Sequence, residues 1–199
     1  MPPISTNMHF GKLFIENSNT DIHIPSFIIG MISPDTINEE DFEDLHTLDE
    51  DGNIDVREFY EQFNINNLNL IQKSFILGYY CHLWFDEYYK FNASKLTLHN
   101  NVEMTDEELG TAVKTVLKYY DNKAINNFFE KYADEINEFN EKLNLNEISG
   151  VSIKKSKEKI YEFFRDAITE VANTQLIEER EYMNFIKNGC SKIMKSLEK

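Results

Sequence analysis

The position of the prolines constrains the fold of this chain most strongly, because proline removes a backbone donor and breaks the interior of a helix. All four prolines of the 199 residues lie before residue 35, and the chain holds only seven glycines. The stretch after Pro34 is therefore free to form long helices. Apolar residues recur there at helical spacing, as in Ile125, Phe129 and Tyr132. This pattern predicts an all-α chain.

The hydrophobic pattern predicts a series of helices separated by short polar breaks. Thr105 and Glu108 form a capping box that opens one of them, and the run 25–33 is short enough that a strand is the alternative there. Because 199 residues with 41% hydrophobic content can fill one core, we expect a single-domain multi-helix bundle over residues 1–199. The expected helical ranges are 8–17, 25–33, 38–46, 55–63, 68–91, 105–120, 124–143, 153–172 and 175–197.

The histidines divide this domain into two halves. None follows residue 99, so we expect residues 1–103 to carry any metal site and residues 104–199 to form scaffold helices. The five histidines are His9, His23, His46, His82 and His99.

The most informative polar residues are His82 and Asp86, in the expected helix 68–91. A spacing of four places both side chains on one face, one turn apart. Phe75 and Gly78 continue that face, so it should be buried. A buried imidazole beside a buried carboxylate is costly unless the two are paired or bind a metal. Histidine nitrogen with carboxylate oxygen is half of a zinc site, and a plain His–Asp hydrogen bond is the alternative.

Three further residues extend this pair into a candidate ligand set. Asp35 follows Pro34 after a buried segment, His46 ends the short acidic helix, and His9 lies on the first helix. The five groups suit zinc or a similar divalent transition metal, and helical bundles gather such ligands from several helices. Taken singly, each has a plainer role, with Asp35 as a helix cap and both histidines exposed.

The order of these residues resembles the zinc-dependent phospholipase C family, which is related in fold to the S1/P1 nucleases. The resemblance covers roughly residues 8–90 and rests on an early His, a Pro-Asp after an apolar segment, a second His, and a Gly-x-x-x-His-x-x-x-Asp helix. The residues that carry it are His9, Pro34, Asp35, His46, Gly78, His82 and Asp86.

The resemblance implies a helical bundle of the phospholipase C type that hydrolyses phosphoesters with zinc. Asp35, His46, His82 and Asp86 would hold a first ion. Asp86 would bridge to a second ion that His9 also binds. Asp35 would also be the catalytic residue, which orients the attacking water or takes its proton.

The chain departs from the family pattern at the remaining metal positions. Met1 stands where the mature family enzymes have Trp, and Asn92 stands where a further His is expected. His99 and Glu103 offer a His-x-x-x-Glu spacing, but they precede the capping box at Thr105, outside the helix. We therefore expect one or two ions rather than three.

A second motif overlaps the first at residues 47–58. Thr47 occupies the first position of an EF-hand-like loop, where Asp is normal, so one calcium ligand is lost. A solvated turn followed by a helix near residue 55 is the simpler interpretation. The residues that match EF-hand positions three, five, six, nine and twelve are Asp49, Asp51, Gly52, Asp55 and Glu58.

Composition excludes some classes of partner. A net charge of −15 argues against binding nucleic acid or an anionic membrane through a basic surface. Twelve acidic residues between 35 and 61, against Arg57 alone, create a field suited to cations. Cys81 and Cys190 form no disulfide framework. No signal peptide and no segment long enough to cross a bilayer are visible, so we expect a cytoplasmic protein.

Three functional hypotheses remain. The first is a metal-dependent hydrolase that acts on a small phosphoester or a lipid head group through a metal-activated water. The second is a non-enzymatic helical protein with a structural His/Asp site. The third is a calcium-binding protein that uses the loop at 47–58.

Overall fold

Helices make up the regular structure of the described chain, as the sequence predicts. The computed structural model describes residues 2–36, 46–99, 104–140, 142–145, 148, 151–166 and 176–197. Within these residues, the one β pairing is an isolated bridge between Leu48 and Ile54. The helices are α1 (Ile4–Asn17), α2 (Ile24–Ile32), α4 (Val56–Glu61), α5 (Leu70–Asn92), α6 (Asp106–Glu138), α7 (Ile153–Arg165) and α8 (Glu179–Leu197), with short 3-10 helices η1 (Ser33–Thr36), η3 (Ile65–Asn67) and η4 (Ala93–Lys95).

Side-chain caps explain where several helices begin. Thr105 and Glu108 form the expected capping box at the start of α6. Asn69 and Gln72 form a second one at the start of α5. Pro25 lies in the first turn of α2, where its missing N–H costs nothing, so the run near 25–33 is helical rather than a strand.

The ranges 105–120 and 124–143 form one helix, α6, of 33 residues, which ends at Glu138 and not at residue 143. The polar residues between them resemble a break in sequence, yet Asp121 and Asn122 are buried and helical. Burial against α1 and α8 stabilises a helical turn that local propensity alone would not favour.

Two expected helices reach beyond the described residues. α7 ends at Arg165, and the range 153–172 continues into residues that are not described. The acidic helix expected at 38–46 also lies outside the described residues, except for His46, which is in a turn.

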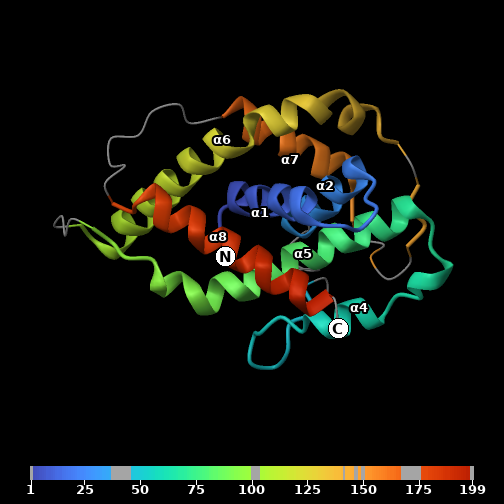
Figure 1. Cartoon of the computed structure of the whole chain (residues 1–199), viewed down its shortest axis with the longest axis horizontal. Helices are drawn as coiled ribbons and strands as arrows, with labels where there is room; N and C mark the ends of the chain where they lie inside the picture. The colour runs from blue at the N-terminus through green and yellow to red at the C-terminus, as the bar shows by residue number, and fades with distance from the viewer. Residues whose placement is uncertain are drawn as a thin grey trace.

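Close contact between α2 and α5 forms the centre of the molecule. A Cβ atom on Gly30 would overlap the carbonyl oxygen of Phe75, and one on Gly78 would overlap that of Phe27. The two glycines therefore let the backbones meet directly. Figure 1 shows α1 and α2 in the middle of the bundle, with α5, α6, α7 and α8 around them.

The core lies on both sides of this central helix pair. On one side, Tyr79 stacks on Phe59 and contacts Phe75, in a cluster that also contains Phe129. On the other, Phe10 and Phe85 pack against Phe185 of α8. The polar pair of α5 is enclosed by these two apolar clusters. None of the described helices has the length and apolar content needed to cross a bilayer.

Candidate metal centre

His82 and Asp86 lie on the inward face of α5, as their spacing predicts. Their exposed fractions are 0% and 4%, and His82 Nε2 lies 3.4 Å from Asp86 Oδ2. Gly78, one turn earlier, lies against α2. The face that carries the pair is thus the face that packs on α2, which is why both side chains are buried.

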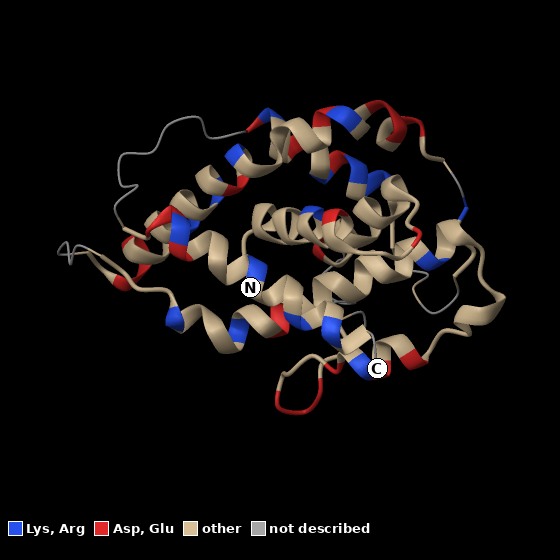
Figure 2. Ribbon diagram, in the orientation of Figure 1, with Lys and Arg blue, Asp and Glu red and all other residues tan. Residues whose placement is uncertain are grey.

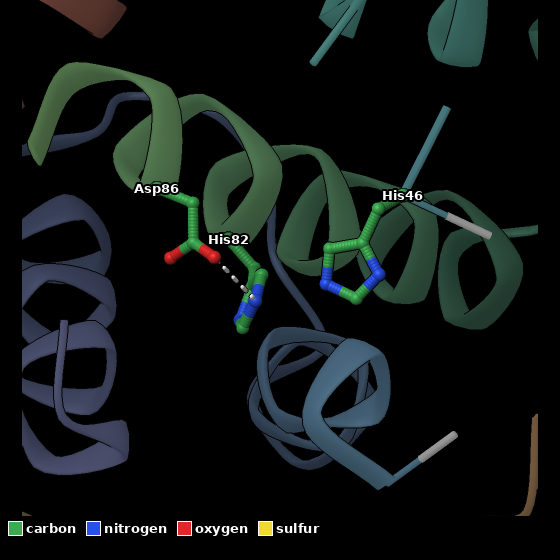
Figure 3. Close-up of side chains that lie close together, drawn as sticks. All are labelled: His46, His82 and Asp86. Atoms are coloured by element: carbon green, nitrogen blue, oxygen red, sulfur yellow. Dashed lines mark ion pairs between the residues drawn. The ribbon is translucent and has the colours of Figure 1, made fainter. Parts of the chain in front are cut away.

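His46 approaches the pair from outside α5. It is fully buried, and its ring centre lies 5.9 Å from that of His82 at an angle of 69°. One ligand-type atom from each of His46, His82 and Asp86 lies within 4.8 Å of the others. Figure 3 shows Asp86 and His82 projecting from α5, with the His46 ring beside that of His82.

Hydrogen bonds connect the segment after His46 to α5. The backbone N–H of Ile54 donates to Glu87 Oε2 over 3.1 Å. The Lys90 ammonium donates to Gly52 O and to Asn53 Oδ1, each over 2.9 Å. These bonds hold the loop against the helix turn that carries Asp86, and so bring His46 to the pair.

The surroundings of His82 fix which ring nitrogen is available to a ligand. Nδ1 lies 2.9 Å from the carbonyl oxygen of Met31, which can only accept, and 3.2 Å from Asn7 Nδ2, which can only donate. The shorter contact assigns the hydrogen to Nδ1. Asn7 Nδ2 donates to Asp86 Oδ1 over 3.1 Å and orients that carboxylate. In a neutral imidazole the lone pair is then on Nε2, facing Asp86. Backbone and amide partners of this kind orient the ligands of metal sites.

The polar atoms that face each other here are not satisfied by ordinary hydrogen bonds. His82 Nε2 and Asp86 Oδ2 lie 3.4 Å apart, within ion-pair distance, but among the described residues neither has a partner with hydrogen-bond geometry. Two imidazoles and a carboxylate are a donor set that zinc accepts. The residues therefore fit a divalent transition ion at this position.

Charge coupling within the cluster shifts the pKa values of its members. Burial alone lowers the pKa of His82, but the carboxylates of Asp86 and Asp35 outweigh burial and raise it to about 9. Burial raises the pKa of Asp86, but the attraction of His82 outweighs it and lowers the pKa below its ordinary value. Without an ion, the pair is thus an imidazolium and a carboxylate.

Asp35 lies at the edge of this cluster, on η1. Its Oδ1 is 4.0 Å from His82 Nε2, and its side chain is 20% exposed, compared with 0% for His82. Burial raises the pKa of Asp35, and the attraction of His82 only partly offsets it. The structure thus brings Asp35 next to the expected ligands, with one side open to solvent.

His9 is not part of the group formed by His46, His82 and Asp86. Its Nδ1 lies 2.9 Å from Asp121 Oδ1 on α6. Asn7 faces α5, and two residues along a helix correspond to a rotation of about 200°, so His9 points away toward α6. Asp121 also accepts hydrogen bonds from other buried groups, namely the hydroxyls of Ser5, Thr6 and Tyr182.

The other two histidines serve the local structure. His23 caps α2 by accepting from the N–H of Ser26. His99 Nε2 lies 3.7 Å from Glu181 Oε2 of α8. Glu103, its expected partner in a His-x-x-x-Glu motif, lies outside the described residues.

Two of the EF-hand-like carboxylates of the 47–58 loop, those of Asp49 and Asp55, accept hydrogen bonds from nearby backbone. Asp49 accepts from the N–H groups of Asp51 and Asn53, which lowers its pKa. Asp55 accepts from the N–H groups of Arg57 and Glu58 and caps α4. Figure 2 shows the acidic residues of this loop beside α5. The observed geometry is that of a turn followed by a helix.

A cavity of about 300 Å³ lies beside the cluster. His46 and Asp86 are among its lining residues, so two of the three candidate ligands border on open space. Its other described lining residues are Leu48, Gly52, Ile54, Glu87, Tyr89, Lys90 and Ala93.

Sequence reasoning missed two supporting groups, Asn7 and Asp121. Asn7 is one of many asparagines in the chain, and nothing in its local sequence marks it as a partner of Asp86. Asp121 lies in a polar interruption that resembles a loop. Comparisons of the chain with protein-family models, with curated proteins and with solved structures each give no match.

Proposed function

We propose that this chain is a metal-dependent hydrolase of phosphoesters, with one divalent ion held by His46, His82 and Asp86. One observation carries the proposal. Ligand-type atoms from these three buried side chains lie within 4.8 Å of one another, next to a cavity. Three protein ligands leave a coordination position for water or substrate, as in catalytic zinc sites.

Different residues of the chain would bind the ion, orient its ligands and accept a proton. A bound zinc ion supplies Lewis acidity and lowers the pKa of a coordinated water to about 7. Met31 and Asn7 orient His82 and Asp86 toward the ion position. Asp35, which is partly exposed and 4.0 Å from His82, is placed to accept a proton from that water or to act as a fourth ligand. The raised pKa of Asp35 brings it closer to that of a useful general base.

Phosphoesters are the proposed substrates because of the ordered resemblance to zinc-dependent phospholipases C. The cavity volume of about 300 Å³ is at the lower limit of small-molecule pockets. A small phosphoester or a lipid head group fits this size. The net charge of −15 disfavours a polyanion such as a nucleic acid.

The experiment is metal analysis combined with phosphoesterase assays on the same samples. The proposal predicts one zinc ion per chain in the native protein, lost with activity in His82→Ala and Asp86→Asn. His99→Ala is the matched control, because His99 lies beside Glu181 and not in the metal cluster. This variant should retain both the zinc ion and the activity. A folded protein that takes up no divalent ion would refute the proposal.

A second function, a structural ion site without catalysis, is favoured by the burial of the ligands. His46 and His82 are fully buried and Asp86 is 4% exposed. Under this alternative, the metal-loaded protein would be stabilised by the ion but would hydrolyse no phosphoester. A phosphoesterase activity that disappears in Asp35→Asn with the ion retained would exclude it.

A further inference from the structure

The cavity beside the metal cluster is lined by two charged groups that the proposed mechanism does not use, Glu87 and Lys90. Lys90 lies one helical turn after Asp86 on α5, so both side chains lie on the same face. Among the described residues that line the cavity, Lys90 is the one with a cationic side chain. Its side chain is exposed, and it lies in the last turn of α5.

The lysine ammonium is oriented by the neighbouring loop. It donates to Gly52 O and to Asn53 Oδ1, each over 2.9 Å. An ammonium group has three N–H donors, so these two contacts leave one. The loop bonds limit the freedom of a long side chain, which lowers the entropic cost of binding a ligand.

The remaining walls of the cavity are largely apolar. Leu48, Ile54 and Ala93 line it, and Tyr89 adds an aromatic ring. The carboxylate of Glu87 is engaged by the N–H of Ile54. A ligand in this space would therefore meet His46 and Asp86 of the metal cluster, the Lys90 ammonium and apolar surface.

We infer that Lys90 binds the phosphate of the substrate, and that the substrate is a small phosphoester with an uncharged, largely apolar substituent. This inference rests on the proposed function of the same site. The phosphate would bind between the ion and the ammonium, and the substituent would lie on Leu48, Ile54 and Tyr89. Lys90 is thus a specificity-determining residue, separate from the metal ligands.

The test measures binding of two probes, inorganic phosphate and phenyl phosphate, to the zinc-loaded protein by calorimetry. Lys90→Met removes the ammonium. Asn53→Ala removes one of the loop bonds but keeps the charge. Lys73→Met removes an equal charge from the exposed first turn of α5. Because a hydrogen bond to a charged group contributes about 1.5–3 kcal/mol, Lys90→Met should weaken the binding of both probes about tenfold or more. Lys73→Met, the control, should change it less than about twofold, and Asn53→Ala should weaken it less than Lys90→Met does, because it loosens the ammonium but keeps it. Phenyl phosphate should bind more tightly than inorganic phosphate.

Each outcome bears on the inference separately from the proposed function. Equal phosphate affinity in wild type and Lys90→Met, an equal loss in Asn53→Ala, or no phosphate binding by the wild type would overturn the inference. Zinc content and hydrolysis measured on the same samples report the proposed function. Lys90-dependent phosphate binding in a protein that hydrolyses nothing would support the inference and contradict the hydrolase.

Discussion

At the scale of the residue, His82 is held in the orientation that a metal ligand needs. The Met31 carbonyl accepts from Nδ1, which leaves Nε2 directed at Asp86. Asn7 orients the carboxylate from the other side. Both supports come from helices other than α5, so the pair is fixed by packing as well as by its own spacing.

The protonation of His82 leads to a prediction about metal uptake. The carboxylates of Asp86 and Asp35 outweigh burial and raise the pKa of His82 to about 9, so the metal-free protein holds a proton there at pH 7.5. A ligand histidine must be neutral, so zinc binding at this pH should release about one proton. Calorimetry in buffers with different protonation enthalpies measures the release, and a binding heat that is the same in every buffer would contradict it.

The same pKa shift fixes how the stability of the metal-free protein depends on pH. The folded-state pKa of about 9 lies above the ordinary value of 6.5. His82 therefore contributes full stability below pH 6.5 and loses this contribution as the pH rises through 9. Urea unfolding measured between pH 6.5 and 9 should show that the free energy of unfolding falls as the pH rises. His82→Gln should remove the part of this pH dependence that comes from His82.

Asp121 leads to a second prediction at this scale, about a site separate from the metal cluster. Its carboxylate accepts from His9 and from three buried hydroxyls. Asp121→Ala leaves these donors unpaired and should lower the free energy of unfolding by about 3 kcal/mol or more. The milder His9→Gln should keep one zinc ion per chain. Loss of zinc in a folded His9→Gln protein would instead make His9 a metal ligand.

At the scale of the element, the contact between α2 and α5 determines where the site lies. Gly30 and Gly78 bring the two backbones together, and His82 lies one turn beyond Gly78. Met31, which accepts from His82, is next to Gly30 on α2. The glycines therefore set the distance between the histidine and its supporting carbonyl.

Glycine replacement tests this contact. Gly78→Ala would place a methyl group against the backbone of Phe27, so the helices must separate, and we expect a loss of about 3 kcal/mol or more in stability. Gly110→Ala is the matched control, since nothing lies within 4 Å of its Cβ position on exposed α6, and it should stabilise by up to about 1 kcal/mol. Chemical denaturation measures both, and similar small effects for the two variants would contradict the account.

Local rules explain which elements could be predicted from the sequence. The capping box at Thr105 and the i, i+4 pair on α5 depend on residues within one or two turns, and both are found where expected. The helical state of Asp121 and Asn122, between the ranges 105–120 and 124–143, depends on burial of Asp121 against two other helices and not on local rules. The direction of His9 likewise depends on how α1 is rotated, which its own sequence leaves open.

At the scale of the whole molecule, the candidate ligands come from segments 36 residues apart in sequence, His46 and His82. The loop that follows His46 is attached to α5 through Glu87 and Lys90. An ion that binds only the folded state would stabilise it by about 2.7 kcal/mol at a free concentration 100 times its dissociation constant. The surplus of negative charge in the chain would also favour a cation.

X-ray absorption at the zinc edge of the zinc-loaded protein tests the central claim most directly, since it identifies the atoms around the ion. The account predicts one ion per chain with two imidazole nitrogens and carboxylate oxygen as its protein ligands, at about 2.0–2.2 Å, and loss of one imidazole in His46→Ala. Sulfur ligation, a coordination shell unchanged in both His46→Ala and His82→Ala, or failure to bind zinc at all would contradict it.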